Sequence, residues 1–293
     1  MQHKPLFSVV IPVYNRPDHI AEAIRSVIAQ KFSDWELLVV DDGSTDSTRE
    51  VILSFTDSRI RYIHQQNAER GVARNTGVRN AVGGYVLFMD SDDLMLPDHM
   101  IQANLVLKKN PGIMFFHLNF KTQGPGGSKV TSFPSILNRV LVKGNPFGCT
   151  GIVVQREIVM KYPFCEDRLL AGTEDYELWL RLAARFPFLH FPAVTSVLCD
   201  HSDRSVAQQV PEELEKRILF FIKQVQSDSE VMAFLKKDFP SFLSRRYSYI
   251  ALHSAMAGNK ALAARYLMKS VSASPLQLLT TRSLHILRFI IWR

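Results

Sequence analysis

The stretch WELLVVDDGS, residues 35–44, joins an apolar run to two adjacent aspartates and a glycine. A short apolar run rich in β-branched residues is typical of a strand buried in a parallel sheet. The stretch FSVVIPV, residues 7–13, has the same character. Ligands bind outside the carboxyl ends of such strands, so Asp41 and Asp42 are expected to lie at a ligand site.

Strand and helix signals alternate through the first half of the sequence. We expect strands over residues 7–13, 35–40, 60–64, 85–89 and 113–120. We expect helices over residues 17–30, 71–81 and 97–109, and another that Ser44 or Asp46 caps and that ends near Phe55. This order predicts an α/β fold with a doubly wound, mostly parallel sheet.

The second half of the sequence changes character along its length. We expect a loop over residues 121–131, a helix over 174–185 and a strand over 193–199. Long helical segments follow at residues 212–226, 240–257 and 260–273. The sequence therefore predicts two domains, with an α/β domain over residues 1–205 and a helical region over 206–293.

Composition and charge limit the class of protein. The 293 residues are 46% hydrophobic and 22% charged, as in an ordinary globular chain, and the net charge is +7. Lys and Arg are spread along the chain and no nucleic-acid-binding motif occurs, so no nucleic-acid partner is expected. Three cysteines without metal spacing, and the lack of a signal peptide or long apolar run, predict a cytoplasmic protein.

Five motifs occur in a fixed order along the chain. They are SVVIPVYNR at residues 8–16, VVDDGS at 39–44, GVARNTG at 71–77, MDSDD at 89–93 and GTEDYELWLRLA at 172–183. Together they resemble the family 2 glycosyltransferases over residues 6–205. The resemblance implies the GT-A fold and a metal-dependent, inverting transfer of one sugar from a nucleotide-sugar, a UDP-sugar by expectation, to a hydroxyl acceptor. It places donor binding in residues 6–120, the acceptor and base in 121–205, and the product among cell-surface polysaccharides, lipopolysaccharides or glycolipids.

The MDSDD motif is the candidate metal site. Carboxylates repel a nucleotide diphosphate unless a divalent cation lies between them, and Mg²⁺ or Mn²⁺ takes carboxylate and phosphate oxygens as ligands. The resemblance assigns the metal to Asp92 and ribose contact to Asp90, with Ser91 on the donor side. The alternative for this segment is a turn and a helix cap.

The VVDDGS motif is the candidate base-recognition site. A carboxylate can accept a hydrogen bond from the imide N–H of uracil, and the resemblance assigns this contact to Asp42, beside Asp41. Pro12 and Tyr14 come from the first motif, and an aromatic ring such as that of Tyr14 can stack on a base. The alternatives are a capping or turn role for Asp42 and ordinary packing for Tyr14.

The GVARNTG motif adds a cation to the donor side. Arg74 is expected to pair with a carboxylate such as Asp42 or with phosphate, since guanidinium suits both. A solvent-exposed helical arginine is the alternative.

The GTEDYELWLRLA motif carries the candidate base. Attack by an acceptor hydroxyl requires the loss of its proton, which a positioned carboxylate can accept. The resemblance assigns this role to Asp175, with Glu174 positioning the acceptor or the base. The alternative is an acidic helix start favoured by the helix dipole. Tyr176 and the apolar residues after it have helical spacing and are expected to face the core.

Two further residues follow the last predicted strand. The resemblance suggests His201 as a second metal ligand and Arg204 as a contact to the diphosphate, with a plain loop as the alternative. The QxxRW motif of processive synthases does not occur, so addition of a single sugar is favoured.

The helical tail is less specific. Residues 257–275 resemble half of a TPR-like helical pair. Residues 276–293 mix Leu, Ile and Phe with arginines. This segment would suit peripheral contact with the inner, anionic face of a membrane, where a lipid-linked acceptor would reside, or packing on the catalytic domain or another subunit.

Three other functions are alternatives to sugar transfer. A glycoside hydrolase also uses paired carboxylates but does not account for a D-x-D beside VVDDGS in a parallel sheet. A nucleotidyltransferase would call for a glycine-rich phosphate loop after the first strand, where this chain has VYNRPDH. A non-catalytic nucleotide- or sugar-binding module stays open, although the ED pair of residues 174–175 argues against it.

Overall fold

The computed structural model describes residues 4–200 and 210–292, and the chain forms two compact units. The first unit consists of Met1–Asn138, Phe147–Arg168 and Arg185–Ser202. The second consists of Arg139–Pro146, Leu169–Ala184 and Asp203–Arg293, so two segments from the middle of the sequence join the C-terminal helices. The boundary predicted near residue 206 falls outside the described residues and stays a prediction.

The first unit is built on one large sheet with the order β3-β2-β1-β4-β8-β6-β9-β5, and β7 pairs with β6. Its strands are β1 (Phe7–Val13), β2 (Trp35–Asp41), β3 (Ile60–His64), β4 (Tyr85–Phe88), β5 (Leu94–Met95), β6 (Phe115–Gly124), β7 (Gly127–Val130), β8 (Ile152–Gln155) and β9 (Leu189–Cys199). Strands β3, β2, β1 and β4 run parallel, and β8 joins β4 in the antiparallel direction.

The register of the central strands brings their carboxyl ends to one edge. Every residue of β1 and β2 is buried, as their continuous apolar runs predict. In the β1–β2 pair Val13 lies opposite Asp41, and in the β2–β3 pair Asp41 lies opposite His64. The loops that follow these strands therefore begin side by side.

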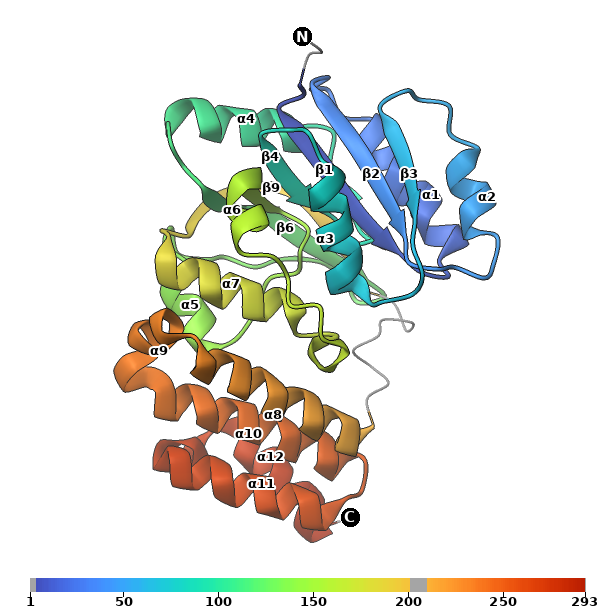
Figure 1. The fold of residues 1–293 in the computed structure, drawn as a ribbon. Coiled ribbons are helices and arrows are strands. Elements are labelled where there is room, and N and C mark those ends of the chain that lie inside the picture. The colour runs from blue at the N-terminus through green and yellow to red at the C-terminus, as the bar shows by residue number, and fades with distance from the viewer. Residues whose placement is uncertain (1–3, 201–209, 293) are drawn as a thin grey trace. The chain divides into compact units, whose positions relative to one another are not determined.

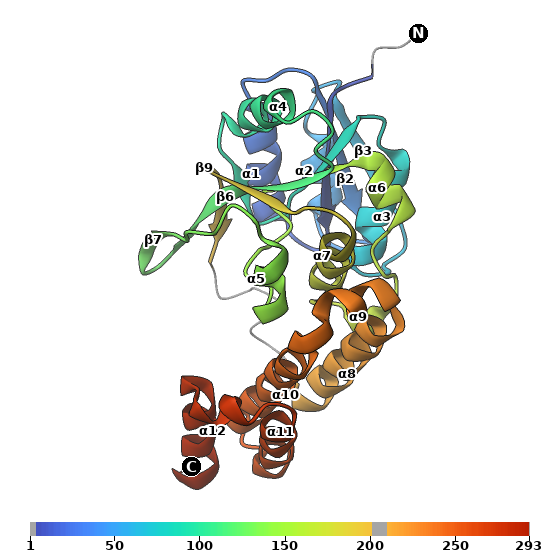
Figure 2. The same ribbon diagram turned by 90° about the vertical axis from the view of Figure 1, so that its left-hand side faces the viewer.

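Helices cover both faces of this sheet. The first unit contains α1 (Pro17–Ile28), α2 (Thr48–Leu53), α3 (Arg70–Asn80), α4 (His99–Lys109) and α6 (Arg156–Lys161). Figures 1 and 2 show α1 and α4 on one face, and α3 and α6 on the other. Helix α1 begins with Pro17, which suits a first helical position, and buries a stripe of apolar residues at helical spacing: Ile20, Ala23, Ile24 and Val27.

One glycine sets how closely α3 approaches the sheet. A Cβ added to Gly77 would lie 2.3 Å from a methyl carbon of Val10 in β1. Real Cβ atoms do not come so near another heavy atom, so the helix can pack here only with glycine. The last glycine of the GVARNTG motif therefore has a packing role.

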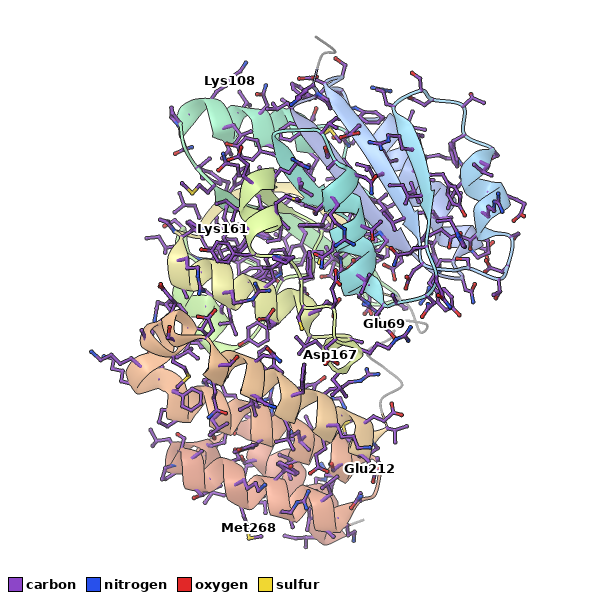
Figure 3. The ribbon with its side chains drawn as sticks, in the orientation of Figure 1. Glu69, Lys108, Lys161, Asp167, Glu212 and Met268 are labelled. Carbon is purple, nitrogen blue, oxygen red and sulfur yellow. The ribbon has the colours of Figure 1, made fainter. Side chains whose placement is uncertain are left out.

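The second unit is helical. It contains α5 (Asn138–Lys143), α7 (Glu174–Arg185), α8 (Pro211–Ser227), α9 (Ser229–Leu235), α10 (Phe239–Met256), α11 (Lys260–Ala273) and α12 (Thr281–Trp292), with short 3₁₀ turns at Arg168–Leu170, Lys236–Asp238 and Pro275–Leu279. Apolar residues of α8, α10, α11 and α12 form its core, and Tyr266 is fully buried there. Met268, which is 67% exposed, lies on the outer side of α11 (Figure 3).

The predicted α/β fold with a helical C-terminal region is confirmed, and most predicted elements lie within a few residues of their observed bounds. The loop predicted over residues 121–131 is wrong in part, because β6 continues to Gly124 and forms a hairpin with β7. All four residues of β7 are exposed, so this strand lacks the apolar signal that a buried strand leaves in a sequence. The helix predicted from Ser44 or Asp46 begins only at Thr48, whose N–H donates to the Asp46 carboxylate over 3.0 Å.

Among the described helices, none combines the length and the apolar character needed to cross a membrane.

The close approach at Gly77 gives a stability prediction. We expect Gly77→Ala to lower the free energy of unfolding by at least about 1 kcal/mol, because overpacking outweighs the helix propensity gained from alanine. Urea denaturation would measure this change. Gly126→Ala is the control, since its Cβ would meet no heavy atom within 4 Å, and we expect a change within about 0.5 kcal/mol. Equal stabilities of the two variants would contradict the packing role.

Candidate active site

Backbone and side-chain hydrogen bonds hold the loops after β1 and β2 together. The N–H of Asp42 donates to the carbonyl of Val13 over 2.8 Å. The N–H of Asn15 donates to the Ser44 hydroxyl over 3.0 Å, and the Asn15 side chain accepts from the N–H of Thr45 over 2.9 Å. The carboxyl edge of the sheet is therefore fixed by the chain itself.

Asp41 has a structural role at this edge. It is 1% exposed, and its carboxylate accepts from the N–H of Ser44 over 2.8 Å and from the Tyr62 hydroxyl over 2.7 Å. Burial and the neighbouring Asp41 carboxylate raise the pKa of Tyr62 to about 12. The predicted donor contact of Asp41 stays a prediction, and the structure shows this side chain engaged with the turn and with β3.

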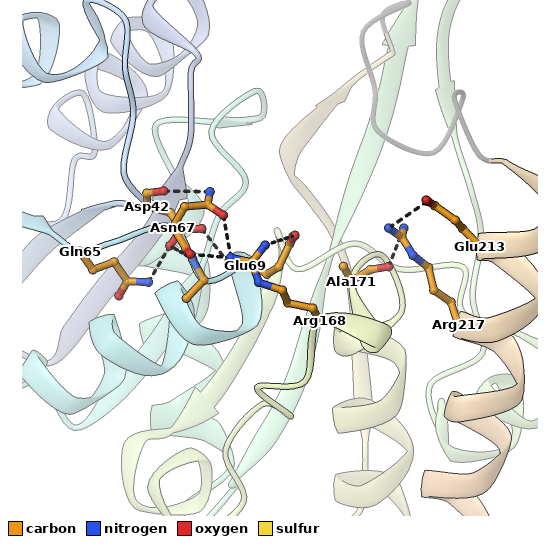
Figure 4. A network of polar contacts seen from close by, with 9 residues as sticks. Asp42, Gln65, Asn67, Glu69, Arg168, Ala171, Glu213 and Arg217 are labelled. Carbon is orange, nitrogen blue, oxygen red and sulfur yellow. Dashed lines mark hydrogen bonds and ion pairs between the residues drawn. The ribbon is translucent and has the colours of Figure 1, made fainter.

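The Asp42 carboxylate is held by three donors from the segment that links β3 to α3. One oxygen accepts from the Gln65 amide over 2.7 Å and from the N–H of Ala68 over 3.0 Å. The other accepts from the N–H of Glu69 over 2.9 Å (Figure 4). Asp42 is 3% exposed, so these bonds fix the direction of its carboxylate.

Arg168 fastens the same segment from a distant part of the sequence. Its guanidinium donates to the Asn67 carbonyl over 2.5 Å and to the Asn67 side chain over 3.0 Å, and lies 3.4 Å from the Glu69 carboxylate (Figure 4). Glu69 adopts φ 78° and ψ 160°, a region that glycine alone occupies readily. Gln65, Asn67, Glu69 and Arg168 were not predicted from the sequence, because none belongs to a motif with recognisable chemistry.

Gly43 allows this tight arrangement. It has φ +81°, and an added Cβ would lie 2.8 Å from the backbone nitrogen of Asn67. The turn predicted after the second strand is present, and only a glycine fits it.

Arg74 pairs with a carboxylate, as expected, and the partner that the structure shows is Asp90; its contact with phosphate stays a prediction. The Arg74 guanidinium lies 2.7 Å from the Asp90 carboxylate and 5.4 Å from the ring centre of Phe164. Arg74 is 2% exposed, whereas the Asp90 side chain is 26% exposed. The alternative of a solvent-exposed arginine is therefore excluded. The pair joins the start of α3 to the end of β4.

The other two aspartates of MDSDD differ in their surroundings. Asp93 is fully buried, and its carboxylate accepts from the Thr150 hydroxyl over 2.7 Å and from the N–H of Cys199 over 3.2 Å. It ties the end of β4 to β9. Asp92 and Ser91 are partly exposed at the tip of the turn. Asp92 is therefore accessible from solvent, as the side chain of Asp90 is in part.

The first motif contributes an exposed ring and a buried proline. Tyr14 is 47% exposed immediately after β1, so its ring is accessible to a planar ligand. Pro12 is buried within β1, beyond the last residue that pairs with β4. A proline is tolerated there because no neighbour on that side requires its N–H. Their assigned donor contacts stay predictions.

Glu174 and Asp175 lie at the start of α7, in the second unit. Glu174 is 3% exposed and accepts from the N–H of Gly172 over 2.7 Å. One oxygen of Asp175 accepts from the Asn145 amide over 3.0 Å, and the other accepts from the N–H of Tyr176 over 2.6 Å. The apolar face predicted for this helix is confirmed, since Tyr176, Leu178, Trp179 and Leu182 are all buried.

Two predicted residues, His201 and Arg204, lie outside the described residues. Within residues 4–200 and 210–292, no group of three or more His, Cys, Asp or Glu side chains is arranged to hold a metal ion.

Comparison with known proteins identifies the family. The family model for glycosyl transferase family 2 matches residues 8–147. Over 179 residues the chain is 33% identical to the UDP-Glc:alpha-D-GlcNAc-diphosphoundecaprenol beta-1,3-glucosyltransferase WfgD of Escherichia coli, a match that covers 60% of this chain and 69% of WfgD. The chain belongs to glycosyltransferase family 2.

Solved structures show that this family 2 glycosyltransferase has the predicted GT-A fold. The S. aureus TarS 1-349 structure in complex with UDP-GlcNAc matches with a TM-score of 0.71 at 20% identity, covering 97% of this chain and 89% of that one. The mannosyltransferase PcManGT from Pyrobaculum calidifontis, in complex with GDP-Man and Mn2+, matches with a TM-score of 0.59 at 20% identity, covering 99% and 88%.

Some relatives of this glycosyltransferase are much longer. The uncharacterized glycosyltransferase RC0461 of Rickettsia conorii is 39% identical over 184 residues, which are 61% of this chain but only 30% of that protein.

The ion pair between Arg74 and Asp90 predicts that this glycosyltransferase loses stability when the Asp90 carboxylate is removed. We expect Asp90→Asn to cost about 2–4 kcal/mol of unfolding free energy without any ligand, because it leaves a buried guanidinium without its carboxylate. Urea denaturation would measure it. Asp98→Asn is the control, since Asp98 pairs with Lys31 on the surface and should cost less than about 1 kcal/mol. A loss for Asp90→Asn as small as that of the control would refute the structural role of Asp90.

Proposed function

We propose that this glycosyltransferase moves a single sugar, with inversion, from a UDP-sugar to a hydroxyl of a lipid-linked acceptor in cell-surface glycan synthesis. One observation carries the proposal. In this family 2 chain, three groups lie at the carboxyl ends of neighbouring parallel strands. The exposed ring of Tyr14 follows β1, the fixed carboxylate of Asp42 follows β2, and the MDSDD turn follows β4.

The hydrogen bonds of Asp42 support uracil as the base. Among the described residues, one oxygen of this carboxylate accepts from two donors, whereas the oxygen bonded to the N–H of Glu69 accepts from one. A carboxylate oxygen can accept two hydrogen bonds, so this second oxygen can still receive the imide N–H of uracil. Cytosine has no N–H at that ring position. Tyr14 would stack on the base, with Pro12 and Asp41 supporting the pocket.

The acidic turn after β4 fits a divalent metal. Its carboxylate oxygens are the ligands that Mg²⁺ and Mn²⁺ prefer, and one or two carboxylates suffice when donor phosphates complete the shell. We assign the metal to Asp92, with His201 as a further ligand, and the ribose to Asp90 and Ser91. The metal would neutralise the charge that develops on the leaving diphosphate. Arg204 would contact the same diphosphate.

Asp175 is proposed as the base. Inverting transfer is a single displacement in which the acceptor hydroxyl attacks the anomeric carbon as it loses its proton. Asn145 and the N–H of Tyr176 each donate to one oxygen of Asp175, and both bonds fix its orientation. Glu174, bonded to the N–H of Gly172, shapes the same helix start. We assign proton acceptance to Asp175 and a positioning role to Glu174.

The acceptor is proposed from the E. coli relative, whose name gives a diphosphoundecaprenol-linked sugar as its substrate. Such an acceptor is anchored in a membrane, so the enzyme would work in peripheral contact with the inner face of that membrane. We assign this contact to residues 276–293, where Leu276 is 75% exposed and Leu279 is 80% exposed.

The donor and the metal can be tested by thermal unfolding. We expect UDP to raise the melting temperature only with Mn²⁺ or Mg²⁺ present, by several degrees at about 100 times its Kd. GDP and CMP should have smaller effects. Asp92→Asn should abolish the metal-dependent shift, while the surface control Asp98→Asn should retain it. A shift that is equal with and without metal would contradict the assignment of Asp92.

The base can be tested by turnover. We expect Asp175→Asn to lower kcat by about 10²–10⁴-fold while UDP binding is unchanged, because a general base acts on the chemical step. Glu157→Gln is the control, since it also removes a carboxylate from the first turn of a helix. Near-normal turnover of Asp175→Asn would exclude it as the base. Nucleotide binding without turnover of any UDP-sugar would favour the non-catalytic binding module.

A further inference from the structure

The net positive charge of the chain arises in its C-terminal part, which lacks acidic residues. The last acidic residue is Asp238, and residues 239–293 contain eight Lys and Arg residues without a single Asp or Glu. Residues 1–238 contain 27 basic and 28 acidic residues. The net charge of +7 therefore arises from the region that forms α10, α11 and α12.

Three of these cations lie on α10 and α12, two helices that pack against each other. Arg245 and Arg246 are on α10, and Arg282 is on α12. The Arg282 guanidinium donates to the Ser248 hydroxyl of α10 over 3.2 Å. Burial lowers the pKa of Arg282, and the charges of Arg246 and Arg245 lower it further. We refer to Arg245, Arg246 and Arg282 as the arginine cluster.

Within residues 4–200 and 210–292, no carboxylate pairs with the arginine cluster. Among the residues that the structure describes, no ion pair involves any of its three members. Arg246 lies 5.0 Å from the ring centre of Tyr176 and 5.2 Å from that of Phe242, and donates to the Lys143 carbonyl over 3.4 Å. Its Nε is buried and has no hydrogen-bond acceptor within the described part of the chain.

Such a cluster is costly in the protein alone. Burial disfavours charge, and like charges held close together repel. No carboxylate from α10, α11 or α12 can relieve this cost, since these helices contain none. A bound anion would relieve it, and guanidinium groups match phosphate oxygens in charge and in hydrogen-bond geometry.

The position of the cluster connects it to the acceptor side of the site. Arg246 packs on Tyr176, which directly follows Asp175 in α7. Arg246 also bonds to Lys143, two residues before the Asn145 that orients Asp175. All of these residues belong to the second unit.

We propose that Arg245, Arg246 and Arg282 bind the phosphate groups of the acceptor, so that the enzyme selects acceptors carrying a diphosphate next to the sugar. This inference rests on the proposed function in assigning the anion to the acceptor. The binding of a phosphate anion by the cluster does not depend on that assignment.

Inorganic pyrophosphate is the direct probe. The buffer contains a chelator, which removes divalent metal and so suppresses metal-dependent binding at the donor site. Under this condition pyrophosphate should raise the melting temperature of the wild-type protein. Arg282→Gln should lose this shift. In anion-free buffer this variant should melt no lower than the wild type, because the repulsion among the charges of the cluster is relieved. The control Arg288→Gln removes the same charge from an exposed position of α12 and should respond like the wild type. Equal responses of the two variants, or no response of the wild type, would overturn the site.

The source of the phosphate can be tested with two ligands. A short-chain prenyl diphosphate, soluble in water, should protect the wild type and Arg288→Gln but not Arg282→Gln. Arg282→Gln and Arg288→Gln remove the same charge from the same helix, so they should sediment equally with vesicles of phosphatidylglycerol and phosphatidylcholine. If Arg282→Gln lost vesicle binding but kept the response to the prenyl diphosphate, the assignment to the acceptor would be overturned. The phosphate bound by the cluster would then be that of a bilayer headgroup.

Transfer assays separate this inference from the proposed function. With a diphosphate-bearing acceptor, Arg282→Gln should raise KM about tenfold or more with little change in kcat. With the same acceptor lacking phosphate, Arg282→Gln and the wild type should have similar KM values. A KM that rises equally for both acceptors would refute phosphate recognition. If pyrophosphate bound but no UDP-sugar gave transfer, phosphate binding by the arginine cluster would be supported and the proposed function would be rejected.

Discussion

The carboxylate of Asp42 is the interaction on which the carboxyl edge of the sheet in the first unit depends. Its three hydrogen bonds join the end of β2 to the segment before α3. One of them holds Glu69 in a backbone conformation that costs about 1–3 kcal/mol for any residue other than glycine. Arg168 secures the same segment from a separate part of the chain. A carboxylate fixed by so many donors cannot turn away, which is the property that the proposed contact with a base requires.

The acidic residues of this edge divide into those that hold the fold and those that face solvent. Asp41 and Asp93 are buried and bonded to Tyr62 and Thr150, and Asp90 is paired with Arg74. Asp92 is partly exposed at the tip of its turn. A loss of activity after replacement of Asp41, Asp90 or Asp93 would thus mix damaged folding with lost ligand contacts, so the effect on stability must be known before a role is assigned.

The sequence predicted those parts whose signals are local. Continuous apolar runs located β1 and β2, the turn at Gly43 followed from its glycine, and the buried face of α7 followed from helical spacing. The partners of the candidate residues could not be predicted, because they are set by tertiary packing. Arg168 contacts Asn67 across about a hundred residues of sequence, and the carboxylate that pairs with Arg74 belongs to Asp90, which the sequence did not single out as its partner. The exposed strand β7 left no apolar pattern to find.

The arginines of the second unit differ from the buried arginine of the first unit in how their charge is compensated. In the first unit the buried Arg74 faces the carboxylate of Asp90, which offsets the cost of removing its charge from water. Arg245, Arg246 and Arg282 are only partly buried, but no carboxylate of residues 4–200 or 210–292 pairs with them, and α10, α11 and α12 contain none. A charge that the protein leaves uncompensated favours binding of an opposite charge from outside. The cluster is therefore better understood as a ligand site than as part of the core that Tyr266 and its apolar neighbours form.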